Sequence, residues 1–141
     1  MPKGLTFAND ELLYVFQATS PSWASNTYFY FALHTSDPTS SGSQTSGEVT
    51  VGAYPAYARV AVIRTSAGLT VASNGVQNAA LVQFPICTAG GTSPVCTNWS
   101  LGTAANGAGE IVYTGTLVAP ITVNTGIQPQ FAAGVLTATE T

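Results

Sequence analysis

Residues 34–37, "HTSD", bring together the side-chain types of a hydrolase: an imidazole, a hydroxyl and a carboxylate. Such chemistry needs a nucleophile, a base and an orienting group within hydrogen-bond reach of one another. His34 is the only histidine, and Ser36 and Asp37 follow it in an extended or turning stretch, where such close neighbours seldom converge. We therefore expect His34 to end a strand and Asp37 to open a turn with Pro38, and the chain is not predicted to be an enzyme.

Carboxylates and glycine-rich turns predict no other reaction centre. Apart from one adjacent pair, the acidic residues are scattered: Asp10, Glu11, Asp37, Glu48, Glu110 and Glu140. Glycosidases need two facing carboxylates, and calcium sites need several converging oxygen ligands. The turns "AGG" and "GAG" lack the helix and lysine of a phosphate-binding loop. No cofactor and no metal ion are predicted.

Two cysteines, Cys87 and Cys96, bracket the segment "TAGGTSPV". Their spacing is not CxxC, and His34 alone completes no zinc site with them. Two interpretations remain open: a reduced pair, as is usual in the cytosol, or a disulfide bridge that closes the loop. In the chain-entropy model, a bridge across so short a loop contributes about 2–3 kcal/mol.

Charged side chains are rare: 6% of the 141 residues, against about a quarter in ordinary globular proteins. The net charge of −3 excludes nucleic-acid binding and a polybasic membrane patch, because both require clustered lysine and arginine. No apolar run reaches the roughly 18 residues of a membrane span. The first residues also lack the apolar core of a signal peptide, so synthesis in the cytoplasm is expected.

The N-terminal segment predicts an arm over residues 1–26 that contains one short helix over residues 6–17, capped by Thr6. The helix should stop before Pro21, since the residue before a proline disfavours helical backbone. Its apolar side chains pack either on the parent domain or on a neighbouring protein. The candidates for contact with a neighbour are Leu5, Phe7, Leu12, Leu13 and Phe16.

Residues 27–141 read as short strands and turns, which predicts an all-β domain: an antiparallel β-sandwich or jelly-roll-like body. "TYFYFALHT" is apolar on both faces, as in a central covered strand. Strand composition recurs in "YARVAVI", "LVQF", "TNWSLG", "EIVYTGTL", "ITVN" and "GVLTATE". "SNG", "AGG" and "NGAG" predict turns, and "NGAG" lies between two alternating runs, as in a β-hairpin.

Several segments, taken in order, resemble a family of small virion proteins of tailed bacteriophages. They are "FALHTSDP", "SGSQTSGEVTVGAYPAYARVAV", "VQFPICTAGGT" and "WSLGTAANGAGEIVYTGTLVAPITVNTGIQPQFAAGVLTATE", which together span about residues 29–140. Members are commonly labelled tail fibre or virion structural proteins. Some resemble capsid decoration (cement) proteins with a β-sandwich or jelly-roll body. Pro55 and the cysteine pair depart from the usual pattern of the family.

The resemblance implies capsid decoration on the outside of the major capsid lattice, where the protein would bridge capsomers and stabilise the shell. Its partners would be the major capsid protein and further copies of the chain, as a homotrimer whose weak contacts become collectively tight. The contact candidates in the N-terminal helix would lie against the capsid.

The alternative is a tail-associated structural or fibre module that touches host glycans through exposed aromatic rings. Core or subunit packing is the commoner fate of such rings. The candidates are Trp23, Tyr28, Tyr30, Tyr54, Tyr57, Trp99 and Tyr113. In either case, the polar stretch over residues 36–52 is expected to be a loop that faces solvent or lies over the coat.

Overall fold

The computed structural model describes residues 3–140, which contain one α-helix, one 3₁₀-helix and nine strands. The helices come first: α1 spans Leu5–Gln17 and η1 spans Ser22–Ser25. The strands are β1 (Tyr28–His34), β2 (Val60–Ile63), β3 (Leu69–Ala72), β4 (Gly75–Asn78), β5 (Val82–Gln83), β6 (Val95–Gly102), β7 (Ile111–Thr122), β8 (Gln130–Phe131) and β9 (Thr137–Thr139). The predicted β body with a short N-terminal helix is confirmed.

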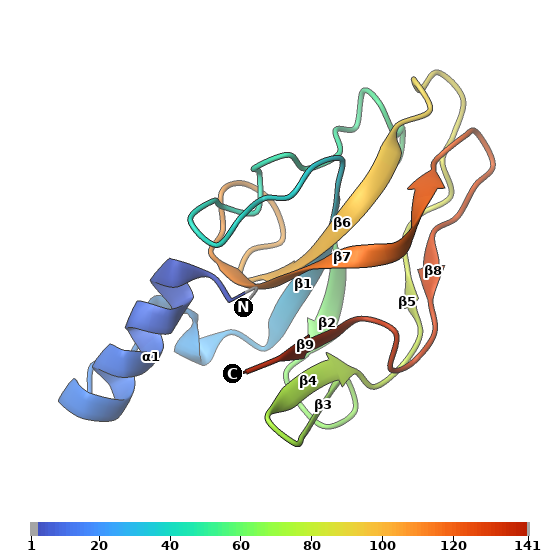
Figure 1. Cartoon of the computed structure of the whole chain (residues 1–141). Coiled ribbons are helices and arrows are strands. Elements are labelled where there is room, and N and C mark those ends of the chain that lie inside the picture. Colours follow the sequence, from blue (N-terminus) through green and yellow to red (C-terminus); the bar gives the residue numbers. More distant parts are fainter. Residues whose placement is uncertain (1–2, 141) are drawn as a thin grey trace.

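The strands of the described residues pair antiparallel in three sheets. The largest has the order β2-β1-β6-β7, the second has the order β3-β4-β9, and the third pairs β5 with β8. Figure 1 shows the four-stranded sheet across the centre, with the β3–β4 hairpin and β9 below it and the β5–β8 pair at its side. Phe31, Trp99 and Leu136 are among the apolar side chains that meet between the two larger sheets. The body is therefore sandwich-like, as predicted.

Strand β1 is covered on both faces, as its sequence predicts. Phe31 and Leu33 point into the core, whereas Ala32 and His34 lie on the opposite face and are also buried. Residues 35–59 fold back over that face, where the amide of Val49 donates to the carbonyl oxygen of Leu33 at 3.0 Å. The polar stretch over residues 36–52 is thus a loop, as expected: Pro38, Gln44 and Val49 are buried, and many of its other residues are exposed.

The turn sequences predicted the β6–β7 hairpin correctly, whereas for the β3–β4 hairpin they predicted the turn but not the strands. β6 and β7 pair around the predicted "NGAG" turn, and β7 continues to Thr122, so "ITVN" extends this strand instead of forming its own. The "SNG" turn is also present, because Ser73 and Asn74 have left-handed φ values of 50° and 60°. The flanking strands β3 and β4 were not predicted. Most residues of these two strands are exposed or half-buried, so their sequences show little of the apolar–polar alternation that predicts a strand.

Helix α1 begins one residue earlier than predicted, and Thr6 is not its cap. The N-cap is Gly4, and no side chain caps the helix. Instead, the amide of Leu5 donates to the carbonyl oxygen of Ser40 at 2.8 Å, and the amide of Gly4 donates to that of Val112 at 3.1 Å. The first turn is therefore held by the body, and Figure 1 shows the remainder of α1 projecting away from the sheets. Residues 1–2 of the predicted arm lie outside the described residues.

Replacing Gly4 by alanine should loosen the attachment of α1. A Cβ atom at Gly4 would lie 1.9 Å from the carbonyl oxygen of Ile111, so the helix or strand β7 must shift. We expect Gly4→Ala to lower the free energy of unfolding in urea by about 1–3 kcal/mol, the usual cost of overpacking. Gly52→Ala is the control, since its Cβ would meet only Thr50 Oγ1 at 3.9 Å. Equal stability of the two variants would contradict this account.

Candidate functional site

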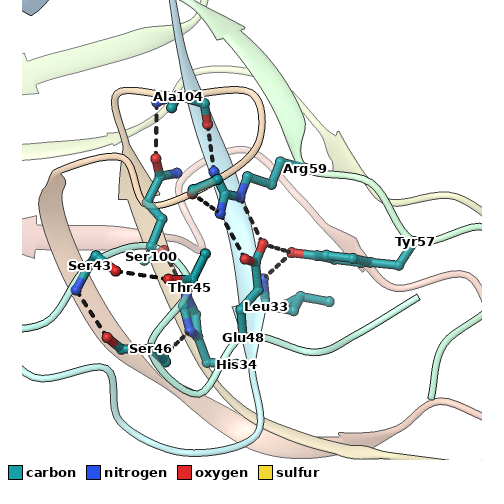
Figure 2. A network of polar contacts seen from close by, with 12 residues as sticks. Leu33, His34, Ser43, Thr45, Ser46, Glu48, Tyr57, Arg59, Ser100 and Ala104 are labelled. Atoms are coloured by element: carbon teal, nitrogen blue, oxygen red, sulfur yellow. Dashed lines mark hydrogen bonds and ion pairs between the residues drawn. The ribbon is translucent and has the colours of Figure 1, made fainter. Parts of the chain in front are cut away.

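His34 ends β1, as predicted, and its ring is completely buried beneath the loop. Nδ1 lies 2.9 Å from the carbonyl oxygen of Ser46, and Nε2 lies 2.7 Å from Oγ of Ser100. Because a carbonyl oxygen only accepts, Nδ1 carries the proton and the Ser100 hydroxyl donates to Nε2. Burial lowers the pKa of His34, which keeps the ring neutral. Figure 2 shows the ring between Ser46 and Ser100.

The predicted "HTSD" trio is not assembled. Ser36 and Asp37 are exposed, and Asp37 Oδ1 accepts the amide hydrogen of Thr39 at 2.9 Å, which makes the expected turn. Ser100 and His34 do have the spacing of a nucleophile and its base, but neither side chain has any exposed surface. A nucleophile must reach its substrate. The His34 ring instead ties the loop, through Ser46, to strand β6, through Ser100.

A second polar group centres on the ion pair between Arg59 and Glu48 (Figure 2). Nε and Nη2 of Arg59 each donate to a different carboxylate oxygen of Glu48 at 2.7 Å, and both side chains are largely buried. The same guanidinium donates to the carbonyl oxygens of Ala104 at 2.9 Å and Gly107 at 2.7 Å. The Arg59 side chain therefore connects three segments: the loop that contains Glu48, the segment that leads into β2, and the connection between β6 and β7.

Tyr57 connects this ion pair to the centre of the sheet. Its hydroxyl donates to Glu48 Oε1 at 2.9 Å and accepts the amide hydrogen of Leu33 at 3.2 Å. Burial, together with the nearby Glu48 carboxylate, raises the pKa of Tyr57. The phenol thus stays protonated, and it completes a chain of contacts from β1 to Arg59.

Gln44 inserts the loop into the β6–β7 hairpin. Its side chain has no exposed surface, and Oε1 accepts the amide hydrogen of Ala104 at 2.9 Å. Gly102 and Gly109 make room for it, since a Cβ atom at either position would approach the amide group of Gln44 within about 2.1 Å. The loop is consequently a packed part of the fold.

The sequence alone did not identify these network residues. Side chains alternate between the two faces along "TNWSLG", so Ser100 was expected on the face opposite to that of Trp99, which is the outer face of the sheet. Glu48 and Arg59 gave no such signal, because their pairing depends on how the intervening loop folds. Within residues 3–140, no cluster of three or more metal-ligating side chains is present.

The foot of α1, defined here as the contacts of Lys3, Phe7, Asp10 and Glu11 with the body, fixes the direction of the helix. Phe7 stacks on Trp23 with ring centroids 4.5 Å apart, and the indole Nε1 of Trp23 donates to Asp10 Oδ2 at 2.9 Å. Phe7 was predicted as a contact residue, but it is buried in this aromatic cluster and is unavailable to a partner.

Acidic side chains and one lysine complete the foot of α1. Lys3 pairs with Glu11 on the helix and lies 2.6 Å from Glu140 near the C-terminus. Burial works against its charge, but these two carboxylates hold the pKa of Lys3 above its ordinary value. Nearby, burial and the Asp10 carboxylate raise the pKa of Glu110, whose Oε2 is buried without a hydrogen-bond partner among the described residues.

Beyond its foot, α1 exposes large apolar side chains. Leu5 is 60% exposed, Leu12 57%, Val15 68% and Phe16 78%, whereas Leu13 is half-buried. A groove of about 550 Å³ runs along the helix beside Trp23. No helix within residues 3–140 has both the length and the apolar character that a bilayer crossing requires. Leu5, Leu12 and Phe16 are thus available for the contact role that the sequence predicted.

Comparison with protein families tests the family resemblance that the sequence motifs suggested. Residues 6–139 match the family described as Podophage GP4 fiber I protein gp80. The chain belongs to this family. It is a phage virion structural protein, and the predicted resemblance to virion proteins labelled tail fibre is confirmed. A search of curated proteins found no match.

The other predicted groups are less accessible than α1. Cys87 and Cys96 are free thiols in the structure, both are buried, and burial raises the pKa of Cys96 to about 11. Their bridge stays a prediction. Of the aromatic candidates for sugar stacking, Tyr54, Trp99 and Tyr113 are buried, and Tyr28 is exposed. Trp23, Tyr30 and Tyr57 are half-buried.

Breaking the buried ion pair should be costly. We expect Arg59→Met to lower the free energy of unfolding by about 3 kcal/mol, because it leaves the Glu48 carboxylate buried without its partner. The double variant Glu48→Gln/Arg59→Met should lose less than the sum of the two single variants. Arg64→Met is the control: Arg64 Nη1 donates to the neutral carbonyl groups of residues 23, 24 and 26, so a smaller loss is expected. Additive losses would contradict the coupling.

The buried His34 should make stability fall in mild acid. Its folded pKa lies below the unfolded value of about 6.5, so the unfolded chain binds the extra proton and the free energy of unfolding decreases as the pH falls below 6.5. The slope should not exceed about 1.4 kcal/mol per pH unit. Glu110 acts with the opposite sign because its pKa is raised, so urea titrations from pH 5 to 7.5 are best made in a Glu110→Gln background. A flat profile there would refute the assignment, since the chain has one histidine.

Proposed function

We propose that this chain is a structural module of a virion fibre that associates through helix α1 and acts by binding, without catalysis. The observation that carries the proposal is the projecting helix, whose outward side chains Leu5, Leu12 and Phe16 are mostly exposed. Contiguous exposed apolar surface of this kind is typical of a protein–protein contact. The family description supports the fibre role.

The free energy available from burying apolar side chains favours α1 as the element through which the chain associates. Complete burial of one large aliphatic or aromatic side chain contributes about 1.5–3 kcal/mol, and α1 exposes five such side chains along a short helix: Leu5, Leu12, Tyr14, Val15 and Phe16. The helix is also held in a defined direction by Phe7 and Lys3, so little conformational freedom is lost when a partner binds. A preformed apolar element suits a permanent assembly.

The body suits the same role through its low charge. With few charged residues, its contacts depend little on ionic strength, which varies widely outside a cell. The polar loop is tied internally by His34 and Arg59, which leaves few charged groups free for a partner. The proposed contacts are therefore mainly apolar and concentrated on α1.

The second candidate is capsid decoration, in which the chain lies on the outer surface of the shell and bridges neighbouring copies of the major capsid protein. The sparse charge and the exposed apolar side of α1 favour it, because both also suit close packing on a lattice. A homotrimer is compatible with either candidate. Neither candidate assigns a nucleic-acid or membrane partner.

Copy number and position distinguish the two candidates. Purified virions should contain a small number of copies on a calibrated gel, and an antibody against the chain should label fibres in electron micrographs. The control is the major capsid protein of the same particles, quantified in the same gel lane. Hundreds of copies with label spread over the shell would overturn the fibre role and establish decoration.

A further inference from the structure

The connection between β6 and β7 contains a peptide unit that no hydrogen bond fixes. Asn106 and Gly107 are both exposed, and Gly107 has a left-handed φ of 75°. Among residues 3–140, neither the carbonyl oxygen of Asn106 nor the amide hydrogen of Gly107 takes part in a hydrogen bond. The peptide unit between these two residues is therefore free to turn, although the next carbonyl group, that of Gly107, is held by Arg59 Nη2 at 2.7 Å.

We propose that Asn106 is a site of spontaneous deamidation, and that its products loosen the polar loop that Arg59 holds in place. The site lies outside helix α1 and does not depend on the association proposed above. An asparagine followed by glycine suits this reaction, because glycine has no side chain to hinder the approach of its own nitrogen to the asparagine side chain.

The reaction needs only water as a co-reactant. The backbone nitrogen of Gly107 attacks Cγ of Asn106, so that a new nitrogen–carbon bond closes a cyclic imide. The side-chain nitrogen of Asn106 leaves as ammonia and takes the proton of the Gly107 amide with it. Water then opens the imide at either carbonyl group, which gives aspartate or isoaspartate. Because the reaction is intramolecular, its rate depends on how readily the nitrogen and Cγ come together.

The other Asn-Gly pair of the sequence provides a comparison within the same chain. Asn74 is also exposed, but its carbonyl oxygen accepts the amide hydrogen of Glu140 at 2.7 Å. Gly75 lies within a sheet, where it is paired with Ala72 of β3 on one side and with Thr139 of β9 on the other. This peptide unit turns only when sheet contacts break, so its nitrogen is kept away from the asparagine side chain.

Both products place a carboxylate beside the ion pair between Arg59 and Glu48. Asn106 and the two paired residues line one groove of about 470 Å³. A new anion in this groove repels the Glu48 carboxylate and competes with it for the guanidinium group. Isoaspartate has a further effect, because its main chain runs through the former side chain and is one carbon longer. The Gly107 carbonyl oxygen is then displaced from Arg59 Nη2.

The loop over residues 36–52 is the part of the body that responds to this change. Arg59 holds the loop through Glu48, and the next residue, Val49, donates its amide hydrogen to the carbonyl oxygen of Leu33 at 3.0 Å. A weaker ion pair lets this segment leave the sheet more often. Copies in a released virion are not replaced, so deamidated chains accumulate as the particle ages.

Ageing of the purified full chain in warm, mildly alkaline buffer tests the site. Chymotryptic peptides separate the two asparagines, mass spectrometry measures the conversion of amide to acid, and an isoaspartate-specific methyltransferase identifies isoaspartate. We expect Asn106 to convert at least about tenfold faster than Asn74, because the hydrogen bonds of the Asn74 peptide unit must break first. A digest made before ageing corrects for conversion during digestion. Equal rates at the two positions would overturn the site.

Hydrogen exchange of the aged chain tests the loosening, with the amide of Val49 as the reporter. We expect ageing to raise its exchange rate at least about tenfold in the wild-type chain. Asn106→Gln is the matched control: it keeps the amide at an exposed position, but its longer side chain closes the imide far more slowly, so ageing should leave its exchange unchanged. Asn106→Asp, measured without ageing, adds the charge without the extra main-chain carbon and should show a smaller increase.

Two results would contradict the loosening. Unchanged exchange at Val49 in wild-type chains whose Asn106 has converted would show that the loop does not depend on this turn. An equal rise in the aged Asn106→Gln variant would show that another change in the chain is responsible.

Discussion

The guanidinium group of Arg59 holds together parts of the chain that are distant in sequence. It forms a bidentate pair with Glu48 and donates to the carbonyl oxygens of Ala104 and Gly107. Taking both charges out of water is unfavourable, and this geometry offsets it only because the remaining donors of the guanidinium also find acceptors. The position of the loop over the four-stranded sheet depends on this pair, and the coverage of β1 depends on the loop.

The way in which the loop covers β1 explains why so few residues of the chain are charged. A strand that is apolar on both faces normally needs a second layer of secondary structure. Here a loop of small polar residues supplies that layer, in which Gln44 Oε1 accepts the amide hydrogen of Ala104 and the His34 ring bonds Ser46 and Ser100. The chain consequently closes its core with few charged residues at the surface, and helix α1 is the element whose large apolar side chains the body leaves exposed.

Local patterns were sufficient where the structure is decided locally. The helix and the "NGAG" hairpin were predictable, since periodicity and turn chemistry act within a few residues. Thr6 failed as a cap because the helix already begins at Leu5, with Gly4 as its N-cap and the amide of Leu5 bound to the carbonyl oxygen of Ser40, so Thr6 lies within the first turn. The buried environment of His34 depends on strand register, which sets Asn98 directly opposite His34 and Ser100, two residues further along β6, opposite Ala32. The exposure of Leu12 and the burial of Phe7 likewise required the docked position of α1.

The acidic residues of the chain determine which side of α1 remains open. Four of the six carboxylates lie at the foot of the helix: Glu11 and Glu140 pair with Lys3, and Asp10 lies beside Glu110 and accepts from Trp23. Ion pairing and burial hold these groups against the body, so a rotation of α1 about its axis would expose Phe7 and separate Lys3 from its partners. The helix is thereby fixed with its uncharged apolar side outward. The exposed apolar side of α1 is thus maintained by contacts on the opposite part of the helix, which makes it a built feature of the fold.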